Sequence, residues 1–424
     1  MPTVLLLATA DAPAIQADLD AQGVRVVGRC EPATLLREAA RSGADVCVAW
    51  DAYPAGGLLQ ALDALQQHAP LPVLLFTQDA DVATLEQALR CGVHAYVVNG
   101  YAPARVRPLL ALARARFERE TALRSAHAEL ERRFEERKLV ERAKGILMRG
   151  RQISEDEAFR LLREASMQGQ EKVGRISQRV IDAARDADTV NRSGQLRMLS
   201  QRLVVLYALQ VADAGATQAP VLRAEAAERI EQNLAQLKQA LSRPTFGDLL
   251  DATTQAWQAL RAALQTAPDA ARLGLIDTTA EQLLDAAEGM TAALEAASPL
   301  ATLAVLNRAG RQRMLSQRLA KEALLATLCQ GAAAQAAADG AVRSIEAFEA
   351  ALVELERAPL STPGIRAELE QARRDWRTLL AGLGDASTAA RRAAIADGSQ
   401  ALLDRFERLS GLYSQGVQRL FESG

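Results

Sequence analysis

Two arginines in matching stretches, Arg197 and Arg313, have the side chains best placed for chemistry in this chain of 424 residues. The run NRSGQLRMLSQRLV, which begins at Asn191, returns at Asn307 as NRAGRQRMLSQRLA, and ten of the fourteen positions are identical. Neither arginine has an Asp or Glu within four positions on its own predicted helix. A guanidinium withdrawn from water is costly unless an opposite charge meets it, and its planar fork matches a small planar anion. The repeat therefore predicts an anion site.

Helical periodicity predicts which residues surround each arginine. Gly194, Arg197 and Gln201 share one stripe of a helix, and their equivalents in the second copy are Gly310, Arg313 and Gln317. A glycine one turn before the arginine allows a neighbouring helix to come close. The side chains that we further expect to line the pocket are Met198, Met314, Ser200 and Ser316.

The motif resembles the signature box of nitrate sensors, as found in PilJ/NarX-type sensor domains and in the NIT domain. That resemblance implies that the arginine holds nitrate, and that two copies of its helix face each other around one ion. Because both copies lie in one chain here, we expect an internal pseudo-dimer in which Arg197 and Arg313 clasp one nitrate or nitrite ion. This requires that the two side chains lie together and that protein carboxylates do not already neutralise them. The alternative is a packing motif whose arginines pair with acids on other helices.

The region that carries the repeat, residues 186–424, reads as helical throughout. Trp257 and Trp376 fall at comparable places in its two halves, 119 residues apart, which supports a duplication. Breaks rich in Gly and Pro divide the region into roughly eight helices, and tandem four-helix bundles are the natural packing for that pattern. The span from Gln282 to Gln330 is expected to be one helix that joins the bundles, with a kink at Pro299.

A basic segment precedes the repeat, at residues 137–185. Ser154 and Glu157 form a predicted capping box for the second of three short helices, and Gly169 suits its end. The segment resembles the ANTAR domain of antitermination regulators through ERAKGILM, SEDEAFRLLREASM and QRVI. The resemblance implies binding to paired stem-loops in a leader RNA, so that a terminator cannot form and RNA polymerase is affected only indirectly.

The charge of this segment fits an RNA-binding role. It holds twelve Lys and Arg against seven Asp and Glu, whereas the whole chain has a net charge of −2. Basic side chains give phosphate contacts, and unpaired loop bases supply sequence choice. The residues expected to contact RNA are Arg142, Lys144, Arg149, Arg151, Arg160 and Arg163.

Residues 1–115 alternate five short apolar runs with helical stretches, which predicts a parallel, doubly wound α/β sheet. This resembles the receiver domain of response regulators, but the phosphotransfer residues are degenerate. Trp50 stands at the phosphoacceptor position, with Asp51 one place late, and Asn99 replaces the lysine. Thr77 survives, and only Asp11 lies near the expected acidic pair. We therefore predict a pseudo-receiver that serves as a docking or dimerisation surface.

A linker helix is expected over residues 116–136. Leu123, Leu130 and Phe134 form one apolar stripe at spacings of seven and four, as in a short coiled coil. A homodimer through this stripe is one possibility, and a solvated helix is the other.

The remaining composition excludes several classes of function. The four cysteines and three histidines form no cluster with metal-ligand spacing, so we expect no metal and no cofactor. No nucleophile–base set or phosphate loop indicates an enzyme. There is no run of about 18 apolar residues and no basic leader before the first strand, so we expect a cytoplasmic protein without membrane contact.

Together these features predict a cytoplasmic, nitrate- or nitrite-responsive transcription antiterminator that controls genes of nitrate assimilation. Anion binding would shift the bundles and reorient the RNA-binding helices through the helix joining Val180 to Arg202. Two alternatives stay open. One is a response regulator phosphorylated on Asp51, and the other is an RNA binder controlled by a partner protein docked on the helical half.

Overall fold

The computed structural model describes residues 2–8, 12–212, 218–298, 300, 302–358, 362–383 and 388–419. The chain forms two compact units, residues 1–135 and 136–424. One 49-residue helix, α5 (Pro103–Arg151), belongs to both, because it leaves the first unit and enters the second. The linker expected at 116–136 is therefore the middle of a longer helix.

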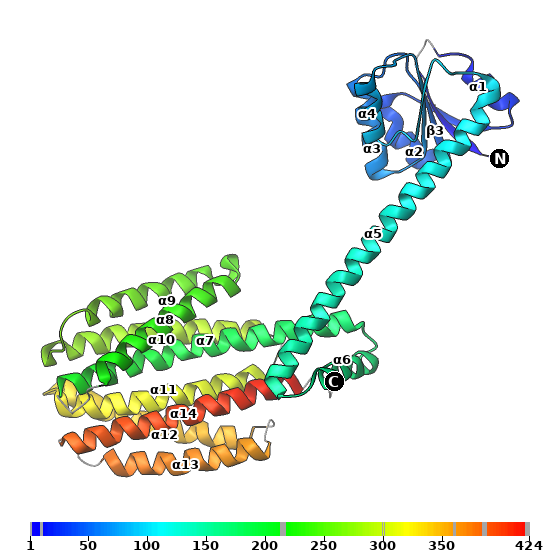
Figure 1. Cartoon of the computed structure of the whole chain (residues 1–424). Helices are drawn as coiled ribbons and strands as arrows, with labels where there is room; N and C mark the ends of the chain where they lie inside the picture. The colour runs from blue at the N-terminus through cyan, green and yellow to red at the C-terminus, as the bar shows by residue number, and fades with distance from the viewer. Residues whose placement is uncertain are drawn as a thin grey trace. The chain divides into compact units, whose positions relative to one another are not determined.

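The first unit is a five-stranded parallel sheet in the order β2-β1-β3-β4-β5 (Figure 1). Its central strands are buried on both faces, as expected for continuous apolar runs between helices. α1 and α5 cover one face, and α2, α3 and α4 cover the other. The strands are β1 (Thr3–Ala8), β2 (Arg25–Cys30), β3 (Val46–Trp50), β4 (Val73–Thr77) and β5 (Ala95–Val98). The helices are α1 (Ile15–Ala21), η1 (Pro32–Thr34), α2 (Leu35–Ser42), α3 (Gly56–His68) and α4 (Val82–Arg90). The predicted α/β architecture is confirmed.

The second unit begins with three helices, which we call the three-helix module: the end of α5, α6 (Glu155–Gln168) and the start of α7 (Val173–Val211). The predicted capping box is present, since Ser154 Oγ accepts from the Glu157 N–H at 3.3 Å and Glu157 Oε2 accepts from the Ser154 N–H at 3.2 Å. α6 ends before Gly169 as expected, but the residue in the left-handed region is Gln170, at φ 51°. A small apolar core joins the three helices.

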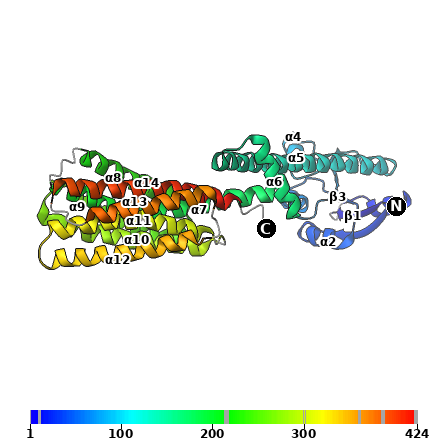
Figure 2. The ribbon, with the colours of Figure 1, turned by 90° about the horizontal axis from the view of Figure 1, so that it is seen from below.

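α7 does not end with the module. The whole helix has 39 residues. Its later part is the first helix of the duplicated region (Figure 1 and Figure 2). The remaining helices are α8 (Ala219–Ala240), α9 (Arg243–Leu264), η2 (Ala270–Arg272), α10 (Leu273–Ala297), α11 (Thr302–Leu328), α12 (Ala332–Glu356), α13 (Pro363–Gly382) and α14 (Ala389–Arg419).

The expected single helix over 282–330 is wrong. α10 ends at Ala297 with Ser298 extended, and α11 starts at Thr302. Proline disfavours the helical conformation of the residue before it, so Pro299, which lies outside the described residues, accounts for the stop at Ser298.

Helices α7–α10 and α11–α14 form two successive four-helix sets, and one hydrophobic core runs through both. α7 and α11 are the central helices, since they pack on each other, on α10 and on α14. Both copies of the repeated motif lie on these two helices. The motif is therefore placed where the two halves of the duplication meet.

Candidate anion site and basic surface

Arg197 on α7 and Arg313 on α11 are both almost fully buried, each with 1% exposure. They border the same glycine, because a Cβ on Gly310 would lie 3.2 Å from Arg313 Nη2 and 3.4 Å from Arg197 Nη2. A Cβ on Gly194 would likewise lie 3.1 Å from Arg197 Nη2. The two guanidinium groups thus lie together, and the glycines leave room for them.

The two repeats exchange hydrogen bonds across this contact. Arg197 Nη2 donates to Asn307 Oδ1 at 2.6 Å, and Arg313 Nη2 donates to Asn191 Oδ1 at 2.8 Å. Each asparagine thus serves the arginine of the other copy. The site has the crossed pattern of an internal pseudo-dimer.

The expectation that no carboxylate neutralises the arginines is wrong. Arg197 Nη1 lies 2.5 Å from Glu288 Oε2 on α10, and Arg313 Nη1 lies 2.6 Å from Glu407 Oε2 on α14. The two acids are themselves repeat equivalents, 119 residues apart like the tryptophans. The Nη1 atom of each guanidinium therefore pairs with an acid on another helix, as the packing alternative predicts.

Burial and charge act against each other at Arg197. Burial lowers the pKa of its guanidinium, and Glu288 opposes that shift. Arginine stays protonated even so. The partners are much less enclosed than the arginines, because the side chains of Glu288 and Glu407 are each 41% exposed.

One donor of each arginine has no partner among the described residues. The Nε atoms of Arg197 and Arg313 are buried and make no hydrogen bond there. A buried N–H without an acceptor is unusual and costs free energy. The two Nε–H groups are therefore buried donors for which the described residues supply no acceptor.

The other side chains expected to line the pocket make contacts elsewhere. Ser200 and Ser316 donate to the carbonyl oxygens of Arg197 and Arg313, one turn earlier on the same helices. Gln317 donates to the Ser399 carbonyl oxygen at 3.0 Å. The remaining three side chains also have other surroundings: Met198 and Met314 are packed in the hydrophobic core, and Gln201 bonds Ser200 and Glu281.

Sequence reasoning missed the two asparagines and the two glutamates. Asn191 and Asn307 were visible as the identical first residues of both copies, but they precede the arginines by six positions and so lie off the predicted stripe. For Glu288 and Glu407 the available signal was their shared spacing of 119 residues.

A second candidate surface lies on the three-helix module. Arg142 and Arg149, seven positions apart, are exposed near the end of α5, and Arg160 and Arg163 are exposed on α6. Arg151 is partly exposed. Phe159, which sequence reasoning passed over, is 44% exposed beside Arg160. This surface, which we call the basic face, combines cations with an aromatic ring.

Lys144 does not belong to the basic face. Its side chain is 9% exposed, and its Nζ lies 2.8 Å from Glu141 and 2.6 Å from Glu155. Hydrogen bonds to these two acids raise the pKa of the ammonium group. Lys144 therefore ties the end of α5 to the start of α6, and we correct its expected role from RNA contact to packing.

In the sheet unit, Trp50 and Asp51 at the degenerate phosphotransfer position border a cavity of about 310 Å³ and also contact neighbouring residues. Trp50 ends β3 and is 9% exposed, with its ring edge-on to Tyr101 at 6.1 Å. Asp51 accepts a hydrogen bond from the Tyr53 N–H, and Thr77 donates to the Ala52 carbonyl oxygen. Asn99 has a positive φ of 47°, and Asp11 lies outside the described residues.

Two family models match this chain. Residues 128–181 match the ANTAR domain. Residues 182–288 and 296–402, together half of the chain, match the family described as "Type IV pili methyl-accepting chemotaxis transducer N-term", or PilJ. The boundary between the two families falls inside α7, so one helix carries parts of both.

Curated relatives cover a smaller part. The transcriptional regulatory protein PdtaR of Mycobacterium tuberculosis, in two strains, is 34% identical over 119 residues. The match covers 28% of this chain, and the chain spans 57% of the length of that relative.

Solved receiver structures are more distant. The signal receiver domain of a modulated diguanylate cyclase from Desulfovibrio desulfuricans G20 is 19% identical, with a TM-score of 0.26 over 28% of this chain and 98% of that one. The response regulator domain of CheB from Thermotoga maritima is 20% identical, with a TM-score of 0.24 over 28% and 97%. Among the described helices, none is both long and apolar enough to cross a bilayer.

Proposed function

Since this chain belongs to the PilJ family and also carries an ANTAR domain, we propose that it is an RNA-binding transcription antiterminator whose activity is set by nitrate or nitrite. The observation that carries the anion half of this proposal is the buried pair Arg197 and Arg313, each with an unbonded Nε–H.

The RNA half is supported by the family match and by the basic face. Arg142, Arg149, Arg160 and Arg163 offer charges to phosphate groups, and Phe159 offers a ring on which an unpaired base can stack. The target is a pair of stem-loops in a leader transcript, with RNA polymerase affected indirectly. The positioning of RNA is a binding task, and we assign the chain no catalytic step.

Because glutamates already hold both arginines, the anion half requires competition and not the empty pair of guanidinium groups expected from the sequence. A nitrate oxygen accepts hydrogen bonds from the Nη1–H donors that Glu288 and Glu407 now occupy, and the Nε–H groups are further donors at the same site. The glutamates reach water easily, because their side chains are 41% exposed. Exchanging one carboxylate for one nitrate also leaves the local charge balance unchanged. Binding therefore replaces protein carboxylates rather than adding a charge to a neutral site.

The signal then has a short physical route. α7 carries Arg197, which would bind the anion, and also Ile176 and Val180 of the three-helix module core. An anion shifts the arrangement only if it binds one arrangement better than the other. Displacement of Glu288 from Arg197 changes how α7 is held against α10, and this is the proposed differential contact. A cytoplasmic location and control of nitrate assimilation are the setting that fits such a sensor.

The anion half is tested by isothermal titration of the full chain with nitrate, nitrite and chloride. We expect saturable nitrate or nitrite binding, and loss of at least tenfold in affinity in Arg197→Lys and Arg313→Lys, because lysine cannot offer the planar fork. Arg243→Lys, an exposed arginine on α9, is the matched control and should bind as the parent does. Equal heats from all four proteins, or no heat from any, would remove nitrate from the proposal.

The RNA half is tested separately by gel shift on a two-hairpin leader RNA, with and without nitrate. We expect binding that depends on both hairpins and changes with nitrate. Binding that is indifferent to the hairpins contradicts the RNA half. Binding that is unaffected by nitrate in a protein that does bind nitrate contradicts the coupling.

A further inference from the structure

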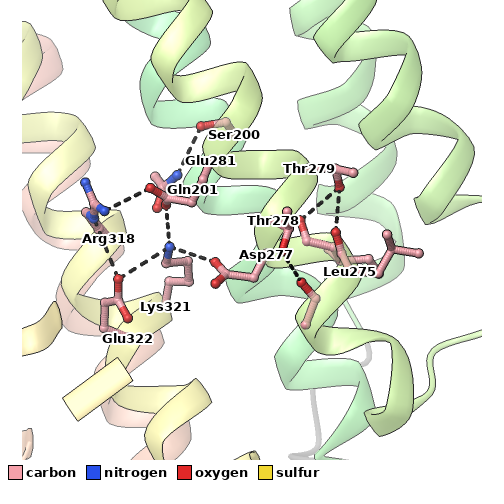
Figure 3. A network of polar contacts seen from close by, with 12 residues as sticks. Ser200, Gln201, Leu275, Asp277, Thr278, Thr279, Glu281, Arg318, Lys321 and Glu322 are labelled. Carbon is pink, nitrogen blue, oxygen red and sulfur yellow. Dashed lines mark hydrogen bonds and ion pairs between the residues drawn. The ribbon is translucent and has the colours of Figure 1, made fainter. Parts of the chain in front are cut away.

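The two copies of the duplication diverge sharply at one place. Figure 3 shows a polar cluster between α11 and α10. There Lys321, with 1% exposure, lies 2.8 Å from Asp277 and 2.6 Å from Glu281. Arg318 lies 2.9 Å from Glu281, and Glu322 completes the group. A buried ammonium group and its surrounding carboxylates fill this side of the molecule.

The pKa values in the cluster reflect both burial and the opposite charges beside each group. Burial opposes the ammonium form of Lys321, but the three acids outweigh it and raise the pKa of the amine. Burial likewise opposes the ionised form of Glu281, and Lys321 and Arg318 outweigh it and lower the pKa of that carboxyl. Burial raises the pKa of the Glu322 carboxyl. The ion pair of Lys321 and Glu281 therefore ties the second copy to the first.

The internal repeat places a counterpart of every cluster residue between α7 and α14. Positions 116 residues earlier on α7, and 119 later on α14, replace the charged residues by smaller or neutral ones. Lys321, Glu322, Asp277 and Glu281 become Val205, Leu206, Ala396 and Gln400, while Arg318 remains an arginine, Arg202.

All five counterparts line one cavity. It has a volume of about 480 Å³, within the range typical of small-molecule sites. Asp397 and Gln218, both exposed, are also part of its wall, so the cavity reaches the surface. Lys321 and its three acids thus occupy one half of the pseudo-dimer at the place where the other half has a cavity.

The wall has the chemistry of a specific site. Arg202 donates to the neutral amide of Gln400, and none of the ion pairs in the described part of the chain includes it. Burial lowers the pKa of its guanidinium, and only the more distant Asp404 and Glu225 oppose this. Another part of the wall is apolar, with Val205, Leu206 and Leu209 on the same stripe of α7 as Arg202, and with Leu222 on α8. A half-buried cation without an ion pair thus lies beside an aliphatic surface, and the carboxylate of the wall, Asp397, is at its exposed rim.

From this geometry we propose that the cavity is a second ligand site, which binds a small organic carboxylate with an apolar portion. The carboxylate pairs with Arg202 inside the cavity and replaces the neutral amide oxygen of Gln400 as the acceptor of that guanidinium. The apolar portion lies against the leucines and Val205. A four-atom ion such as nitrate would leave most of 480 Å³ unfilled, so this site is distinct from the one between Arg197 and Arg313.

The repeat itself supplies the decisive variant. Val205→Lys combined with Gln400→Glu rebuilds the Lys321–Glu281 pair in the cavity, so the filled arrangement is one that this fold already contains. Arg202→Gln removes the cation alone. Arg243→Gln, on the exposed surface of α9, is the matched control for loss of an arginine.

The experiment is saturation-transfer difference NMR on the full chain with benzoate, and with benzamide as its uncharged analogue. We expect a saturable benzoate signal from the parent and the control, weaker binding of benzamide, and benzoate affinity reduced roughly tenfold or more in Arg202→Gln and in the double variant. Nitrate titration and thermal melting of the same proteins show that the fold and the first site persist. No benzoate signal from the parent, or equal signals from the parent and the double variant, would overturn the proposal. Failure of nitrate binding alone leaves this site standing, because its residues are different.

Discussion

At the level of single residues, burial and charge act against each other where each buried arginine meets its glutamate. Arg197 and Arg313 are enclosed to 1% exposure, and each is held by one carboxylate and one amide oxygen. Removing the partner of a buried charge is strongly destabilising, because the charge is left without compensation. The glutamates, being 41% exposed, are not subject to the same penalty when the contact opens. In the proposed function, the acids are therefore the members of the pair that the anion would displace.

A first prediction concerns Glu288→Gln. A neutral amide competes less well than a carboxylate for Arg197, so nitrate affinity should rise about tenfold, and the thermal midpoint without nitrate should fall. Added nitrate should raise that midpoint more in the variant than in the parent. Differential scanning calorimetry and titration measure both effects. Glu231→Gln, an exposed acid paired with Arg261, is the control; an unchanged nitrate affinity in Glu288→Gln would show that the acid and the anion do not share the arginine.

A second prediction separates Arg142 from Lys144. Arg142→Ala should weaken RNA binding and reduce the slope of log affinity against log salt by about one, because one phosphate contact is lost. Its thermal midpoint should not change, since the side chain is exposed. Lys144→Ala should instead lower the thermal midpoint, since Glu141 and Glu155 lose their shared partner. The opposite pattern would return Lys144 to the basic face.

At the level of elements, the long helices α5 and α7 each connect two parts of the chain. α7 runs from the core of the three-helix module into the candidate anion site without a break. α5 carries Leu123, Leu130 and Phe134 on one stripe, and their exposures are 62%, 65% and 58%. Apolar side chains repeated on one face of a charged helix favour pairing with a second helix of the same kind.

A third prediction follows for α7. Arg185→Pro removes a backbone donor and clashes with the preceding turn, so it should interrupt the helix between the two sites. Nitrate should still bind, but it should no longer change RNA affinity. Arg185→Ala, which keeps the helix, is the control. Titration and gel shift on the same samples give the answer, and full coupling in the proline variant would exclude α7 as the route.

A fourth prediction follows for α5. If two copies pair through the stripe, Leu123→Glu with Leu130→Glu should lower the molar mass seen by light scattering to that of one chain. Ala128→Glu, exposed on the opposite side of the helix, should have no effect. A parent that is already monomeric at micromolar concentration would contradict pairing.

At the level of the whole molecule, the two halves of the duplication share some contacts and differ in others. The crossed asparagine bonds and the paired glutamates repeat in both halves, so the anion site is nearly two-fold. The Lys321 cluster and the cavity beside Arg202 do not repeat. At equivalent positions, one half of the pseudo-dimer therefore contains ion pairs and the other contains a cavity.

A fifth prediction tests the symmetry directly. Asn191→Ala and Asn307→Ala should reduce nitrate affinity by the same factor within about threefold, because each removes the acceptor that orients one arginine. Lys321→Val should lower the thermal midpoint, because Asp277, Glu281 and Glu322 lose their shared cation. Unequal effects of the two asparagine changes would mean that the anion contacts one copy alone.

The sequence by itself determined the local elements and the residues that matter most. Apolar runs gave the five strands, Ser154 and Glu157 gave the start of α6, and the repeated motif identified both arginines, because these signals depend on neighbours in the chain. Only the tertiary structure decided that Glu288, Glu407 and the crossed asparagines meet those arginines, that α10 and α11 are separate, and that Lys144 is enclosed. Charge pairing between helices depends on how the helices pack. For the same reason, equivalent positions of a repeat can hold an ion-pair cluster in one copy and a cavity in the other.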